Sequence, residues 1–169
     1  MCILIVKPAG VKLPPQQVLK RCAHRNPHGC GFATADKCFK SLSLSAFTRE
    51  LSKVDPSEAM IIHFRYATHG SVNRSNCHPF KDEQIGVAFA HNGVLPIIPY
   101  QDKTDSETAF IRLFKPIIAK CGLYSAELRD MVDTVIGGSK FAFIDENGNI
   151  KTFGRFIDIN GVYYSNLNF

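Results

Sequence analysis

Short apolar runs separated by polar turns recur along the chain. The first lies at residues 2–7, includes three β-branched side chains and predicts a buried strand. Similar runs predict strands at residues 59–64 and 85–90. Towards the carboxyl end, a meander with a turn at residues 145–149 is predicted over residues 141–144, 150–153 and 162–164.

Apolar residues at helical spacing predict helices between these strands. We expect the helices to begin after residues 14–15, at Ser45, at Thr104 or Asp105, and near residue 125. Pro116 lies inside the third pattern and should kink or split that helix. Leu42 and Leu44 alternate with polar neighbours, which predicts a short strand before the second helix.

The order of these elements predicts the fold class. Strands at both ends with helices grouped between them indicate two sheets covered by helices, an α+β layered fold. The chain has 169 residues, a length that suits a single domain over residues 1–169 with roughly 70% of its unfolded surface buried. No apolar run approaches the ~20 residues of a membrane-spanning helix, and residues 2–7 lack the features of a secretory signal. We therefore expect a soluble, cytoplasmic protein with no membrane contact.

Charge and cysteine usage exclude other classes. The 20 lysines and arginines exceed the 15 acidic residues, for a net charge of +5, but they are scattered, so nucleic-acid binding is not favoured. We expect the six cysteines to be reduced thiols. The Cys22, His24, His28 and Cys30 group does not match the paired spacing of zinc sites, and neither a metal nor a cofactor is expected.

Three polar clusters are candidates for chemistry. Residues 65–70 and 91–93 end apolar strands, and residues 104–107 open a helix. Each has a simpler explanation by itself: Asn92-Gly93 is a common hairpin signal, and Arg65 suits a surface ion pair. Because all three clusters lie at the ends of strands or the start of a helix, a shared site explains them better than three unrelated turns do.

Cys2 adds a nucleophile directly after the initiator methionine. If Met1 is removed, this residue carries both a thiol and a free α-amine. An α-amine titrates at about pH 7.7–8.0, so it can act as a general base beside its own thiol. The alternative is that Cys2 is only a small apolar strand residue.

The motifs in register resemble those of a known family. In order, they are Met1-Cys2, NPHGCGFA at 26–33, RYATHG at 65–70, NCHPF at 76–80, HNG at 91–93 and TDSE at 104–107. This sequence is similar to class II glutamine amidotransferases, the N-terminal-cysteine members of the N-terminal nucleophile hydrolase superfamily. The resemblance runs from residue 2 to about 107 and continues weakly to residues 163–166. It implies a four-layer αββα sandwich of two mainly antiparallel sheets covered by helices.

The resemblance also implies catalytic roles. Cys2 would attack the side-chain amide of L-glutamine, forming a thioester that yields glutamate and ammonia. The Asn92 side chain and the Gly93 backbone N–H would form the oxyanion hole. His78 and His91 are expected to be structural, holding loop geometry by hydrogen bonds rather than acting as bases.

Substrate-binding roles follow in the same way. Arg65 would pair with the substrate α-carboxylate through its guanidinium fork, and Asp105 would accept the α-ammonium. Thr68 and His69 would wrap the same end of the substrate. Independently of the family, an amino-acid amide needs a cation, an anion and an amide-directed donor, which Arg65, Asp105 and Asn92 supply.

The chain departs from the family pattern at His28, where an acidic residue is usual, and at Cys30, which is often aromatic. No synthetase or transferase domain accompanies the motifs. We therefore expect a stand-alone glutaminase domain that works with a separate ammonia-accepting synthetase or transferase chain, or as a homo-oligomer through the exposed loop after residue 26. Two alternatives remain: a catalytically inactive binding or regulatory domain, and a hydrolase of another amide. Activity should require loss of Met1.

Overall fold

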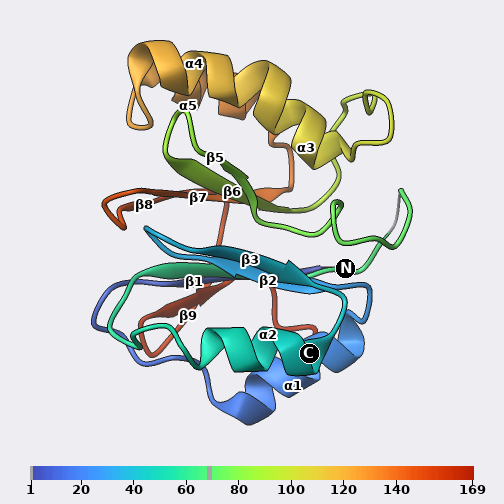
Figure 1. Cartoon of the computed structure of the whole chain (residues 1–169). Coiled ribbons are helices and arrows are strands. Elements are labelled where there is room, and N and C mark those ends of the chain that lie inside the picture. Colours follow the sequence, from blue (N-terminus) through green and yellow to red (C-terminus); the bar gives the residue numbers. More distant parts are fainter. Residues whose placement is uncertain (1, 68–69) are drawn as a thin grey trace.

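Two antiparallel sheets stacked face to face form the centre of the molecule, and helices cover both outer faces (Figure 1). The computed structural model describes residues 2–67 and 70–169. The larger sheet has the strand order β3-β2-β4-β1-β10-β9 and the smaller one β5-β6-β7-β8. This arrangement confirms the predicted four-layer αββα architecture.

Six strands lie close to their predicted positions, whereas the strands at residues 30–33, 38–41, 80–82 and 157–159 were not predicted. The larger sheet contains β1 (Ile3–Lys7), β2 (Cys30–Ala33), β3 (Cys38–Ser41), β4 (Met60–Phe64), β9 (Ile157–Ile159) and β10 (Val162–Tyr164). The smaller sheet contains β5 (Phe80–Asp82), β6 (Val87–Asn92), β7 (Lys140–Asp145) and β8 (Ile150–Phe153). The helices are α1 (Gln16–Arg25), α2 (Leu44–Leu51), α3 (Asp105–Ala109), the π-helical turn η1 (Phe110–Phe114), α4 (Lys115–Cys121) and α5 (Ala126–Val135).

The central strands are apolar on both faces because each face packs against a different layer. In β1, Ile3 and Ile5 face the core beneath α1 and α2, while Leu4 and Val6 face the opposite sheet. Alanines contribute much of the core between the sheets, which lets the two backbones approach closely. A second helix-facing core lies under α3, α4 and α5 and is rich in phenylalanine.

Two predictions around residue 44 are wrong. Leu44 begins α2 rather than belonging to a strand, and the helix is capped by Ser43, not Ser45. The Ser43 hydroxyl accepts a hydrogen bond from the Ala46 N–H at 3.3 Å. Both serines are exposed and similar in kind, so the first turn of the helix is set by where Phe47 must meet the core.

Pro116 alters the helix around it, as predicted. It lies in the first turn of α4, which follows η1 directly. Because proline has no N–H to donate, the turn before it widens, and the Lys115 N–H bonds to the Phe110 carbonyl five residues back. Thr104 caps α3, accepting a bond from the Glu107 N–H at 3.1 Å. Within the described residues, no helix is both long and apolar enough to cross a membrane.

Candidate active site

The three polar clusters and Cys2 converge on one small pocket. Cys2 precedes β1, the 65–67 segment follows β4, and residues 104–106 open α3. The pocket is small, with a volume of about 40 Å³. It is lined by Cys2, Arg65, Tyr66, Ala67, His78, His91, Gly93, Thr104, Asp105 and Ser106. The predicted convergence of the clusters is therefore observed. Thr68 and His69 lie outside the described residues.

Cys2 is held by the backbone of Tyr66 and by the side chain of Asn166. The Tyr66 N–H donates to Cys2 Sγ at 3.2 Å, and the thiol lies 3.4 Å from the Tyr66 carbonyl. Asn166 donates its side-chain N–H to the Cys2 carbonyl at 3.0 Å. Burial raises the pKa of the Cys2 thiol, opposed by the Tyr66 hydrogen bond and the charge of Arg65. A thiol in this state requires a base before it can attack.

Asn92 and Gly93 end β6 beside the pocket. Asn92 Nδ2 donates to Ser165 Oγ at 2.7 Å, and the same hydroxyl oxygen accepts the Leu4 N–H at 2.9 Å. Ser165 thus joins the strand that carries the thiol to the strand that carries Asn92. This bond uses one of the two N–H groups of the Asn92 amide. Sequence reasoning did not assign a role to Ser165, although it lies in the weakly matching segment at residues 163–166.

Gly93 occupies a position that only glycine fits. Its φ is +147°, and a Cβ at this position would come within 2.1 Å of Ser139 Oγ. The residue therefore needs both the left-handed backbone and the missing side chain. Gly93 lines the pocket, whereas its neighbour Asn92 is buried behind it.

Arg65 is buried, although the sequence alone suits a position on the surface. Its side chain is 3% exposed, and Nη1 donates to the Ser71 carbonyl at 3.0 Å. The Asn76 side chain donates to the same carbonyl at 3.1 Å. The Arg65 backbone pairs with the turn at residues 28–29, through bonds of 2.8 and 3.0 Å. A guanidinium fixed in this way places a positive charge at the pocket.

Asp105 faces the pocket from the first turn of α3. Its Oδ2 accepts the Leu95 N–H at 2.8 Å, and its Oδ1 accepts the Ser106 N–H at 2.7 Å. The carboxylate therefore lies opposite a cation and a thiol in the same pocket.

Three buried histidines lie at this site, and two of them, His78 and His91, line the pocket. His63 Nε2 lies 3.0 Å from the His91 carbonyl, and His91 Nδ1 lies 2.8 Å from Ser106 Oγ. Burial lowers the pKa of His63 to about 3 and that of His91 to about 4, and it lowers the pKa of His78 as well. All three are therefore neutral at pH 7, which agrees with the expectation that His91 is structural.

His78 differs from what was expected. Neither of its ring nitrogens has a hydrogen-bond partner among the residues that the structure describes, so it does not hold a loop by hydrogen bonds. Its ring packs instead against His63 and Phe80, with centroid distances of 4.3 and 4.6 Å. The prediction of a hydrogen-bonding role for His78 is wrong, and the side chain acts as a packing group.

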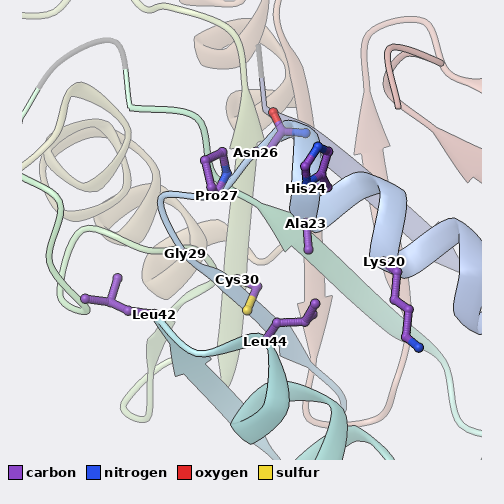
Figure 2. A pocket seen from close by; sticks show the side chains of 9 residues that line it. All are labelled: Lys20, Ala23, His24, Asn26, Pro27, Gly29, Cys30, Leu42 and Leu44. Carbon is purple, nitrogen blue, oxygen red and sulfur yellow. The ribbon is translucent and has the colours of Figure 1, made fainter.

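The departures at His28 and Cys30 affect the neighbouring loop. His28 Nδ1 accepts the Ala67 N–H at 2.9 Å, and its ring contacts Tyr66 at 5.1 Å. His28 thus supports the segment that also bonds Cys2. A separate pocket of about 440 Å³ is lined in part by residues 26–30 of this turn. In Figure 2, the Cys30 side chain lies near Leu44 at this pocket. In the described parts of the chain, no group of three or more His, Cys, Asp or Glu side chains is placed to hold a metal ion.

A four-layer αββα sandwich with a cysteine directly before a central strand is the architecture that the motif resemblance implies. Residues 39–153 match the sequence profile described as "Glutamine amidotransferases class-II". This stretch is more than half of the chain, and the chain belongs to that family. The resemblance inferred from the motifs is confirmed.

The similar curated proteins are long enzymes. "Glutamine--fructose-6-phosphate aminotransferase [isomerizing]" of Methanococcus maripaludis is 37% identical over 82 residues, covering 46% of this chain and 14% of that protein. The protein of the same name from Methanothermobacter thermautotrophicus is 28% identical over 102 residues, covering 57% of this chain and 17% of its own. The chain therefore spans less than a fifth of the length of either relative.

Solved structures agree on the fold. The glutamine phosphoribosylpyrophosphate amidotransferase from B. subtilis superposes with a TM-score of 0.59 at 19% identity, covering 97% of this chain and 41% of that one. A structure described as the allosteric regulatory enzyme of purine biosynthesis gives a TM-score of 0.58 at 22% identity, covering 86% of this chain and 36% of its own. At these identities the likeness concerns the fold alone.

Proposed function

We propose that this protein hydrolyses the side-chain amide of L-glutamine through a Cys2 thioester. The observation that carries the proposal is the shared pocket, where the Cys2 thiol lies with the Arg65 cation, the Asp105 carboxylate and the Gly93 backbone. These groups match the three polar parts of glutamine: a carboxylate, an ammonium and an amide. Thr68 and His69 are assigned to the same substrate end from the family motif.

The reaction begins with a proton transfer inside one residue. Once Met1 is removed, the α-amine of Cys2 takes the thiol proton and the sulfur attacks the amide carbon. The amide oxygen gains negative charge, which the Gly93 N–H and the remaining Asn92 N–H stabilise. The C–N bond then breaks, and the leaving nitrogen takes the proton from the α-ammonium and departs as ammonia. Water, deprotonated by the same amine, cleaves the thioester to glutamate and restores the thiol.

We further propose that another polypeptide uses the ammonia. Both relatives described above are named as aminotransferases acting on glutamine and fructose 6-phosphate. Ammonia released into water is protonated and diluted, so a separate synthetase or transferase, or a second copy of this chain, would receive it directly. A pull-down from the native source coupled to an ammonia assay tests this. Full activity of the isolated chain without stimulation by source extract would contradict it.

Comparison with Cys2→Ala tests the hydrolytic function. The Met-free protein should release ammonia from L-glutamine, and Cys2→Ala should release none above background, because no other group in the mechanism forms the thioester. Cys121→Ala, which removes an exposed cysteine, is the matched control and should keep wild-type activity. Equal activity of Cys2→Ala and wild type would remove Cys2 from the mechanism. No activity in the Met-free wild type would favour a binding or regulatory domain.

A further inference from the structure

A chain of hydrogen bonds connects the smaller sheet to the Asp105 carboxylate. Ser106 Oγ lies 3.1 Å from Asp105 Oδ1 and 2.8 Å from His91 Nδ1. His91 belongs to β6, where it pairs with Phe141 of β7. His91 and Ser106 are 2% and 3% exposed, so water does not compete for these bonds.

Counting protons fixes the direction of every bond in this chain. A carboxylate only accepts, so the single hydroxyl proton of Ser106 is donated to Asp105. Towards His91 the same hydroxyl can then only accept, and the histidine must donate from Nδ1. Burial lowers the pKa of His91 to about 4, so the ring is neutral at pH 7 and carries its one proton at Nδ1.

The result is a carboxylate with one acceptor position left. Oδ1 accepts from both the N–H and the hydroxyl of Ser106, and Oδ2 accepts from the Leu95 N–H. A carboxylate has about four acceptor positions, so one remains on Oδ2. Three donors on two oxygens prevent the group from rotating, and the pairing of His91 in the sheet extends that rigidity to the first turn of α3.

We infer that His91 and Ser106 are positioning residues, which orient Asp105 so that its remaining acceptor position selects substrates with an α-ammonium group. This inference rests on the proposed glutaminase function. It gives the histidine of the HNG motif and the serine of the TDSE motif one shared role, which acts through Asp105 and not on the reacting amide. The role concerns binding of one end of the substrate, so its loss should raise KM more than it lowers kcat.

The test compares L-glutamine with glutaramate, the same molecule without the α-amino group. The KM for glutamine and the inhibition constant of glutaramate against glutamine hydrolysis are measured in the Met-free protein. In Ser106→Ala the KM for glutamine should rise about tenfold or more, the size expected for a hydrogen bond to a charged group. The glutaramate inhibition constant should change less than about threefold. Thr108→Val, which removes another buried hydroxyl of α3, should alter neither constant.

Histidine variants provide a second readout. His91→Asn keeps an N–H near the position of Nδ1 and should retain most of the preference for glutamine over glutaramate. His91→Gln, whose amide reaches the position of Nε2, should lose that preference. If Ser106→Ala raises the KM for glutamine and the inhibition constant of glutaramate by the same factor, the inference is overturned while the glutaminase function stands. A wild type that releases no ammonia from glutamine overturns both.

Discussion

At the scale of single residues, the site depends on charges held in a low-dielectric environment. Arg65 is buried and bonded to the Ser71 carbonyl. Its guanidinium is therefore already ordered and loses little conformational entropy when a ligand binds. Arg65→Lys keeps the charge but loses the planar fork that matches a carboxylate. We expect kcat/KM for glutamine to fall roughly 10- to 100-fold, mainly through KM, as measured by steady-state ammonia release. Unchanged kinetics would mean that another residue binds the α-carboxylate.

Gly93 provides a prediction about stability as well as activity. Gly93→Ala places a methyl group within 2.1 Å of Ser139 Oγ at a φ of +147°. The free energy of unfolding should fall by roughly 1–3 kcal/mol, measured by chemical denaturation. Gly138→Ala is the matched control, because its added methyl would have no atom within 4 Å. A Gly93→Ala protein as stable as the control would contradict the constrained geometry assigned to this turn.

At the scale of elements, the sandwich buries neutral histidines on its central strands β4 and β6. Burial lowers the pKa of His63 to about 3 and of His91 to about 4, while the unfolded values lie near 6.5. The unfolded chain therefore binds more protons than the folded one between these values, and stability must fall as pH decreases through that window. Above about pH 6.5 this contribution is fully present.

This proton linkage can be measured directly. The free energy of unfolding should fall between pH 6.5 and 4 by up to about 1.4 kcal/mol per pH unit for each buried histidine. His78, whose pKa is also lowered by burial, can be replaced without breaking a hydrogen bond that the structure describes. His78→Asn should therefore make the pH dependence shallower. A flat profile for the wild type over this range would contradict the buried neutral state of the cluster.

The sequence predicts elements well where one physical pattern dominates. The apolar strands of both sheets stand out because they are buried on two faces, and β8 and β10 were predicted at their observed positions. The short strand β9 was not predicted, since Ile157 and Ile159 are exposed at a sheet edge and carry no burial pattern. The choice between Ser43 and Ser45 as cap was decided by tertiary packing, which local sequence does not contain.

At the scale of the whole molecule, the site is assembled from segments far apart in the chain. The motifs indicated which residues matter, and the pocket lining includes Cys2, Arg65, Gly93 and Asp105. The hydrogen-bond partners were harder to predict, because Ser165 meets Asn92 across 73 positions of sequence. Such partners are ordinary serines with no local signal. The roles of all these residues, the single-domain organisation and the cytoplasmic location stay predictions.

The central claim is that Cys2 acts as an N-terminal nucleophile and needs its own free α-amine. The most direct measurement compares the Met-free and Met-retaining forms of the same chain, separated and identified by intact mass, for ammonia release from L-glutamine. Burial raises the pKa of the Cys2 thiol, so without the amine as base the sulfur stays protonated. We predict turnover in the Met-free form and none above the Cys2→Ala background in the Met-retaining form. Normal turnover in a fully Met-retaining sample would contradict the account.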